Sequence, residues 1–174
     1  MGVLKDLTKE YFGEILRKED EINIDGIDVD IVTFTDKNGN VHRRGYKPKE
    51  IYSLKILLKR MIEVRGDEGD FNDIDTSEIE SMSFLFTNKK TFNGDISGWD
   101  VSKVKSMTSM FDNATSFNQP IGKWDVSSVW NMNSMFESAT SFDQDISNWN
   151  IKDVDVFNMF KNCPIKNKHK PKKK

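Results

Sequence analysis

The sequence predicts an α+β protein in which a short solenoid of about four coils follows a small N-terminal region of helix, β-hairpin and helix. Two observations carry this prediction. The second half of the chain repeats every 25 residues, and the first half holds helix-period and strand-period patterns outside that repeat. Repeat units of this size cannot bury their own apolar faces and therefore stack. We expect the boundaries to fall at 1–46, 47–70, 71–163 and 164–174.

The repeat is carried by large apolar residues that return at the same step. The sets spaced by 25 residues are Phe92, Phe117 and Phe142, Ile96, Ile121 and Ile146, and Trp99, Trp124 and Trp149. The first copy starts at Phe71 and is four residues short, and the last copy loses one residue after Val154. Irregular terminal copies are typical of units that face something other than another repeat. We expect the apolar residues to point inward, with the tryptophans buried and stacked about one coil apart.

The first 46 residues predict a helix followed by a β-hairpin. Apolar side chains recur at steps of three and four over about residues 3–18, which is typical of one helix face. Further on, Ile27, Val29 and Ile31 alternate with aspartates, as in a strand. The dipeptide at positions 38 and 39 is Asn-Gly, a strong signal for a hairpin turn, so the return strand should follow it.

The segment after the hairpin predicts a helix that caps the first end of the solenoid. Pro48 marks its boundary, and apolar residues stand at helical spacing over about 50–65, up to Gly66. At the other end we expect residues 160–165 to close the last coil, with Cys163 as a small buried hydrophobe. The segment 164–174 holds six lysines and has only Ile165 as an apolar anchor, which predicts a flexible basic tail.

Two polar patterns have a structural interpretation beside a functional one. A short polar residue recurs at the repeat step at Asp75, Asp100, Asp125 and Asn150. Such side chains hold turns by accepting backbone hydrogen bonds, and the alternative is an acidic stripe for a cation or a basic partner. In the hairpin, Asp36, Asn38 and Asn40 alternate like calcium ligands, but the glycine falls at the fourth place of that loop instead of the sixth. We interpret this segment as a turn.

The residues that catalysis requires are scarce and scattered. His42 and His169 lie far apart in sequence, Cys163 is the only cysteine, and there is no glycine-rich phosphate loop. We therefore assign no catalytic residue, no cofactor site and no metal site, and we expect a protein that is not an enzyme.

Composition and charge limit the classes of partner. No stretch approaches the ~20 apolar residues of a membrane-spanning helix, so we expect no membrane insertion. The start of the chain shows neither a signal peptide nor a lipoprotein cysteine, which favours a cytoplasmic location, with a surface or secreted one as the alternative. The net charge is −2, and without the six lysines of the tail it is −8. An acidic body disfavours nucleic acid as the main partner, apart from weak contact by the tail.

One aromatic residue breaks the repeat in an informative way. Trp130 follows an inward position and should point outward. We match it to Glu80, Lys105 and, allowing for the shortened last copy, Asp155, all of which are charged, as an exposed position would require. Exposed tryptophans are enriched among interface hot spots. Our hypothesis is that Trp130 anchors a protein interface rimmed by these three residues; the alternative is that it is merely exposed or covers a neighbouring stem.

The repeat resembles a known family. Phe-Asn, Ile, Trp-Asp-Val-Ser, Val, Met and Met-Phe at these spacings, over about residues 71–163, are similar to the BspA-type bacterial leucine-rich repeat, also described as the mycoplasma lipoprotein-type repeat. The resemblance implies a right-handed, leucine-rich-repeat-like solenoid. Each coil would hold a short strand near 104–107 or its equivalents, followed by a short helical turn. It also implies binding to host or partner proteins, often at a cell surface.

These observations favour a non-enzymatic protein-binding module. We expect a protein partner, whose identity the sequence does not specify, and a role such as that of an intracellular inhibitor, immunity protein or effector. The first alternative is a surface or secreted adhesin-like repeat protein. The second is a structural scaffold that associates with itself through exposed strands.

Overall fold

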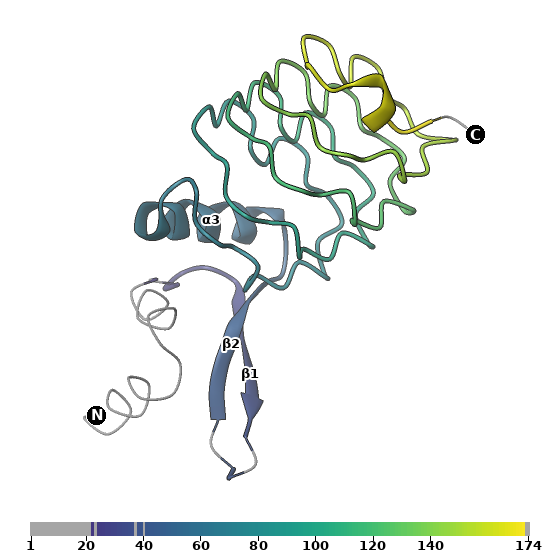
Figure 1. The fold of residues 1–174 in the computed structure, drawn as a ribbon. Coiled ribbons are helices and arrows are strands. Elements are labelled where there is room, and N and C mark those ends of the chain that lie inside the picture. The colour runs from purple at the N-terminus through teal and green to yellow at the C-terminus, as the bar shows by residue number, and fades with distance from the viewer. Residues whose placement is uncertain (1–21, 23, 37, 40, 173–174) are drawn as a thin grey trace.

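The computed structural model describes residues 22, 24–36, 38–39 and 41–172 (Figure 1). The elements in chain order are β1 (Val29–Thr35), β2 (Val41–Pro48), α3 (Ile51–Arg65) and a short 3-10 helix, η2 (Asn167–His169). Figure 1 shows the hairpin and α3 at one end, followed by a stack of coils that leads to the C-terminus. The helix predicted over about 3–18 lies outside the described residues.

The hairpin pairs β1 with β2 in antiparallel register, with an irregularity between Val32 and Thr33. Its turn is held by Asp36, whose carboxylate accepts the Asn38 amide at 2.8 Å and whose carbonyl accepts the Gly39 amide at 3.0 Å. Gly39 has a φ of 84°, which glycine adopts without the steric cost that a side chain brings. Asp36 and Asn38, which resemble calcium ligands in the sequence, therefore act here as parts of a turn, and the predicted hairpin is present. Asn40 lies outside the described residues.

Helix α3 carries the apolar stripe that the sequence indicates. Its buried residues are Ser53, Leu54, Leu57, Leu58 and Met61. Gly66 ends the helix in the left-handed region, and its amide donates to the Ile62 carbonyl at 2.8 Å. In the last turn Arg65 binds Asp73 through two hydrogen bonds of 2.6 and 2.7 Å, which ties the end of the helix to the coil that follows.

The coils are numbered here by their phenylalanine starts: first (71–91), second (92–116), third (117–141) and last (142–163). Strand β2 joins the first coil through a parallel bridge between Tyr46 and Ile74, and Gly45 is required there because a Cβ atom would overlap the Asp73 carbonyl oxygen. After α3 the chain meets the second coil through a bridge between Asp70 and Asp95. Helix α3 lies between these two contacts along the chain. It therefore occupies the place that one side of a preceding coil would have taken.

Successive coils are joined along one side by a ladder of backbone hydrogen bonds. Parallel bridges connect Ser81 to Ser106, Ser106 to Asn131 and Asn131 to Asp155. The family resemblance implied a short strand near 104–107, whereas the structure has a single bridge at Ser106. The reason is local: Ser109 and Asn113 have φ values of 51° and 57°, so the backbone turns before a strand can extend.

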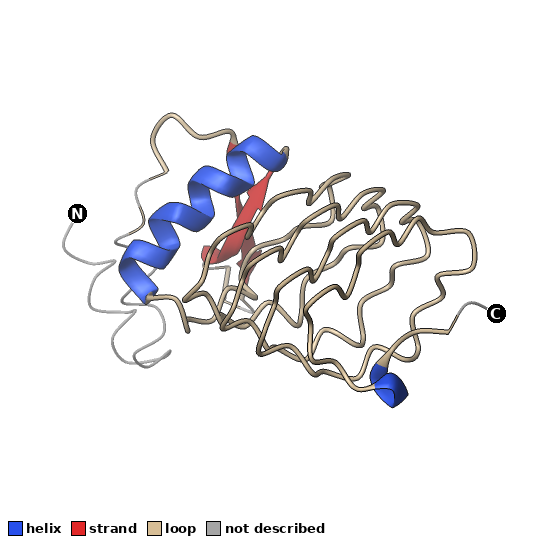
Figure 2. Ribbon diagram, turned by 90° about the horizontal axis from the view of Figure 1, so that it is seen from above, coloured by secondary structure: helices blue, strands red, loops and turns tan. Residues whose placement is uncertain are grey.

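The interior of the stack consists of aromatic columns. Phe86, Phe111, Phe136 and Phe160 follow one another at ring-centroid distances of 5.4, 5.5 and 5.9 Å. The repeat tryptophans Trp99, Trp124 and Trp149 are buried as predicted, and the rings of Trp124 and Trp149 stack at 6.5 Å. Each buried side chain of this size contributes ~1.5–3 kcal/mol relative to exposure. Figure 2 shows the coils side by side between α3 and the C-terminal 3-10 helix.

The recurring aspartates hold turns. Asp75, Asp100 and Asp125 each accept the amide of the serine two residues later at 3.0 Å. The hydroxyl and amide of Ser127 lower the pKa of Asp125, because both donate to its ionised form. These aspartates therefore hold turns, which is the structural interpretation that the sequence pattern favoured.

The basic segment after the last coil has an anchor that the sequence does not reveal. The Lys166 amide and the His169 ring each lie 2.9 Å from the Asp143 carboxylate, which the Lys166 ammonium also contacts. The Ile146 amide donates to the His169 carbonyl at 3.0 Å. The expectation that Ile165 alone anchors this tail is wrong, because a hydrogen-bonding partner in the preceding coil leaves no trace in the tail's own sequence.

Candidate protein-interaction face

The outward side chains of residues 80–84, 105–109, 130–134 and 155–158 form one surface, called here the ladder face. They lie beside the bridges that join the coils, so each position is repeated in the next coil except where the last coil is one residue shorter. Between the first two coils a chain of hydroxyl groups crosses this face, from Ser83 to Ser106 at 2.9 Å and from Ser106 to Thr108 at 3.1 Å.

Amides and a carboxylate continue this chain in the later coils. The Asn133 side chain donates to Asp155 at 2.8 Å and accepts the Phe157 amide at 2.6 Å. The backbone amide of Asn133 donates to the side-chain oxygen of Asn131 at 2.9 Å. Because these groups bind one another, the middle of the ladder face is a polar strip whose side chains are held in place before any partner arrives.

The predicted column of Trp130 is present in three coils. The Lys105 amide donates to the Glu80 carbonyl at 2.8 Å, and the Trp130 amide donates to the Lys105 carbonyl at 3.0 Å. The side chains of Lys105 and Glu80 form an ion pair at 2.8 Å, with both groups more than half exposed. The structure thus places Glu80, Lys105 and Trp130 at the same position of successive coils.

Asp155 belongs to a different column. Its backbone amide donates to the Trp130 carbonyl as the Trp130 amide does to Lys105, but its side chain takes the place of Asn131. Asp155 forms the bridge with Asn131, and its carboxylate accepts the backbone amide two residues later, as the Asn131 side chain does. The match of Asp155 to Trp130 made from the sequence is therefore a misalignment. One residue is missing after Val154, and the sequence cannot tell which of two adjacent positions was lost. The structure omits the position of Trp130 in the last coil, so the column of Trp130 ends there, and the Trp130 side chain is 58% exposed.

Two further aromatic residues lie on the same face and were not singled out from the sequence. Phe84 in the first coil is 55% exposed, and Phe157 in the last coil is 70% exposed. Other coils carry Ser109 and Ser134 at the position of Phe84, and Thr108 and Asn133 at that of Phe157. The sequence did contain a signal that could have identified them, namely an aromatic residue at a position where the other copies of the repeat have a small polar one.

Ion pairs between coils rim this surface. Lys103 lies 3.3 Å from Glu78, and Lys161 lies 2.6 Å from Glu137. The Lys161 ammonium lowers the pKa of Glu137, and the Glu137 carboxylate raises the pKa of Lys161. Ion pairs at the surface add little to stability, so their main effect is on the pattern of charge that a partner meets.

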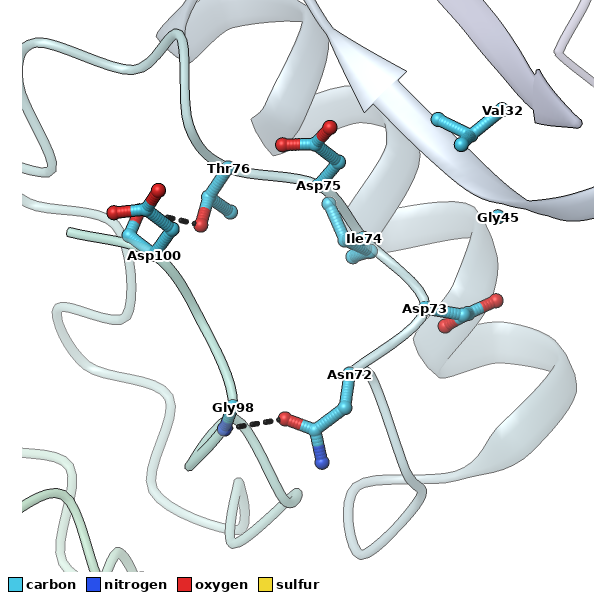
Figure 3. Close-up of a pocket in the computed structure, with 9 residues that line it drawn as sticks. All are labelled: Val32, Gly45, Asn72, Asp73, Ile74, Asp75, Thr76, Gly98 and Asp100. Atoms are coloured by element: carbon cyan, nitrogen blue, oxygen red, sulfur yellow. Dashed lines mark hydrogen bonds between the residues drawn. The ribbon is translucent and has the colours of Figure 1, made fainter. Parts of the chain in front are cut away.

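A cavity of about 330 Å³ lies between the hairpin and the first two coils (Figure 3). Val32 and Gly45 line it from the hairpin, and Asp73 and Asp75 line it from the first coil. Asp73 is bound by Arg65, and Asp75 lies 3.6 Å from the Lys47 ammonium. Since both carboxylates already have cationic partners, we assign no ligand to this cavity.

The two histidines lie on β2 and η2, at opposite ends of the molecule (Figure 1). Within the described ranges, no group of three or more His, Cys, Asp or Glu side chains is placed to hold a metal ion. The helices of the described part include none that is long and apolar enough to span a bilayer. Cys163 is half-buried, and burial raises the pKa of its thiol.

A comparison with known protein families gives a match. A family model described as a mycoplasma protein of unknown function, DUF285, matches residues 56–172. The matched region takes in most of α3, all the coils and the segment that closes the last coil. No curated protein and no solved structure matches the chain.

Proposed function

The chain belongs to the DUF285 family of mycoplasma proteins, whose function is unknown, and from the geometry of its coils we propose that it is a non-enzymatic protein-binding module. The stacked coils serve as a leucine-rich-repeat-like solenoid of the BspA type. The 25-residue step, the aligned bridges and the aromatic columns support this view of the fold. The ladder face is the binding surface.

The observation that carries the proposal is the placement of three exposed aromatic side chains on one face. Phe84, Trp130 and Phe157 are each more than half exposed. Large apolar groups that are left in water gain free energy when a partner covers them, and aromatic residues dominate interface hot spots. Each of the three stands where other coils carry small polar or charged residues, so the repeat itself does not require an aromatic group there.

The polar strip supports the same function. Hydrogen bonds hold the side chains of Ser83, Ser106 and Asn133 before binding. A surface whose side chains are already ordered loses less conformational entropy on association than a mobile one does. Charged groups such as Lys105 and Glu80 at the edge of Trp130 supply the polar rim that is common around a hot spot.

The test is capture of a partner from the source cell, followed by affinity measurement with purified variants. Trp130→Ala should weaken binding by ~2 kcal/mol or more, about 30-fold, with an unchanged melting temperature. Tyr52→Ala is the matched control, because Tyr52 is 66% exposed but lies on α3, away from the ladder face. It should bind like the wild type.

Two outcomes would contradict the proposal. Unchanged affinity of Trp130→Ala for the captured protein would remove the ladder face as its binding surface. Equal weakening by Tyr52→Ala would show that any exposed aromatic group has the same effect. Light scattering on the purified chain adds a third arm, since concentration-dependent oligomers would favour the self-associating scaffold instead.

A further inference from the structure

The last coil ends the backbone ladder with a row of hydrogen-bond donors. In each earlier coil, alternate amides donate to carbonyls of the next coil; in the third coil the donors are Met132, Ser134, Phe136 and Ser138, at 2.7–2.9 Å. The matching amides of the last coil are those of Val156, Asn158, Phe160 and Asn162. None of these four donates to an acceptor among the described residues. They are called here the open edge.

The segment that follows the last coil closes another side of it. Its contacts go to Asp143 and Ile146, and the Lys170 ammonium lies 5.7 Å from the centre of the Phe160 ring. These contacts satisfy groups at the start of the last coil and cover one aromatic ring, but they place no acceptor on the open edge.

The chain from the open edge onward is basic. Residues 156–172 contain five lysines and no acidic residue, and Lys170 lies near the ring of Phe160. Asp155, directly before the open edge, has a carboxylate that already accepts from the Asn133 side chain and the Phe157 amide. Two of the five lysines are paired, Lys161 with Glu137 and Lys166 with Asp143. Within the part of the chain that the structure describes, Lys168, Lys170 and Lys172 form no ion pair. An incoming segment therefore meets three lysines that form no direct ion pair.

An exposed apolar group lies within the open edge. Phe157 stands between the donors of Val156 and Asn158 and is 70% exposed. The second and third coils carry Thr108 and Asn133 at this position, where their side chains take part in the polar strip. Phe157 thus adds an apolar anchor at the one coil whose backbone donors are unmet.

We infer that the open edge binds an acidic segment of the partner protein, which adds to the ladder as a further coil would; this inference rests on the proposed function. Peptide carbonyls at alternate residues match the two-residue spacing of the donors, carboxylates meet the lysines, and an apolar side chain covers Phe157. The other occupant is a second copy of the chain, because the first-coil carbonyls of Ser81, Ser83, Leu85 and Thr87 accept no hydrogen bond from the described residues. Concentration-dependent oligomers in light scattering would therefore overturn the choice of a partner protein.

The probe is a fluorescein-labelled synthetic peptide of about ten residues, the upper length of ordinary strands, in which Glu and Thr alternate. Fluorescence anisotropy with the full chain should show binding at least about tenfold tighter than that of the same peptide with Lys in place of Glu. Equal binding of the two peptides would overturn the assignment to an acidic partner.

A pair of aromatic variants tests the position. Phe157→Asn places at the open edge the residue that the third coil carries there. Tyr52→Ala is the control, because Tyr52 is also exposed but lies on α3, at the other end of the stack. We expect about tenfold weaker peptide binding for Phe157→Asn and no change for Tyr52→Ala. Equal effects would contradict the inference.

Amide signals of the ¹⁵N-labelled chain test the hydrogen bonds themselves. The signals of Val156, Asn158, Phe160 and Asn162 should shift and gain exchange protection when the acidic peptide is added. Shifts confined to lysine neighbours would reduce the site to charge attraction and overturn the ladder addition. A single-stranded oligonucleotide that protects the same four amides as well as the peptide does would overturn the choice of a polypeptide.

The same measurements separate this inference from the proposed function. If the peptide fails to bind while the captured partner still requires Trp130, the open edge is not used and the ladder face stands. If the peptide protects the four amides while Trp130→Ala leaves the captured partner unaffected, the ladder face is wrong and the open edge stands alone.

Discussion

The two ends of the stack are finished in different ways. At the first end a helix of fifteen residues, α3, lies against the coils (Figure 2), and its Leu57 and Met61 are fully buried. At the last end the structure describes only η2, three residues long, and the core is filled by Ile165. Both ends shield apolar groups from water. Among the described residues, the last end leaves a row of backbone donors without a partner, and the first end leaves carbonyls of the first coil.

This difference separates two requirements of a stacked fold. Apolar area must be covered at each end, since every large side chain left in water costs ~1.5–3 kcal/mol. Backbone amides at an end can instead bind water, provided that they are accessible. Both end coils meet the first requirement and leave backbone groups to solvent or a partner, and the last coil adds to its donors an exposed aromatic side chain, Phe157.

The largest expected effect lies between the two ends. Trp124→Ala should lower the free energy of unfolding by ~3–5 kcal/mol, because the Trp124 ring is 4% exposed and stacks on Trp149. Urea denaturation measures it. Trp149→Ala, one coil nearer the last end, should cost less if that end relaxes more easily. Equal losses would show that the last end is as tightly packed as the middle.

The next effect tests the helical cap. Leu57→Ala should cost ~2–5 kcal/mol, because the Leu57 side chain is fully buried between α3 and the coils. Tyr52→Ala on the same helix is the control and should change stability little, since Tyr52 is 66% exposed. A stable Leu57→Ala protein would mean that α3 is dispensable for closing the first end.

A smaller effect is expected at the last end. Removal of residues after Ile165 takes away the His169 carbonyl that accepts the Ile146 amide, together with the contacts to Asp143. One net hydrogen bond contributes ~1 kcal/mol, so the melting temperature should fall by a few degrees. Differential scanning calorimetry measures this change. An unchanged melting temperature would restore the view, drawn from the sequence, of a tail without an anchor.

The smallest effect depends on pH. Hydrogen bonds from the Lys166 side chain and amide and from His169 hold the pKa of Asp143 well below its usual range. A depressed carboxyl pKa stabilises the fold above the unfolded pKa of about 3.9, and this stability is lost as pH falls through the lower folded pKa. Asp143→Asn should therefore lower the melting temperature at about pH 6 and make little difference at the acid end of this window.

The control for that experiment is Asp153→Asn. Asp153 is an exposed aspartate of the same coil, and no described residue forms a hydrogen bond or ion pair with its side chain. Its replacement should leave the melting temperature unchanged at both pH values. A loss at acid pH equal to that at about pH 6 would show that Asp143 acts through its shape and not its charge.

Much of this architecture could be predicted from periodicity. The 25-residue step of the tryptophans and phenylalanines indicates stacked units with those residues inside, and all three repeat tryptophans are buried. The Asn-Gly turn and the apolar stripe of α3 are equally local signals. Such patterns can be recognised in a single sequence because each copy of the repeat must bury an apolar side chain at the same position.

The candidate site was only partly accessible to the same reasoning. Trp130 stands out because its equivalents are charged, but Asp155 was placed in the wrong column, since a one-residue deletion has two alignments with almost the same pattern. Phe84 and Phe157 look like core residues in a repeat that is rich in phenylalanine, and only their position in the coil shows that they face outward.

The repeat, the buried columns, the hairpin turn and the capping helix follow from the amino-acid sequence alone, because each depends on residues near one another in the chain or at one fixed step. Tertiary structure alone decided that Asp143 holds the segment after the last coil, and that the donors at Val156 and Asn158 remain open. These features depend on which backbone groups meet across coils. A backbone amide carries no mark of its partner in the sequence, so only the folded path of the chain decides whether it is bonded or free.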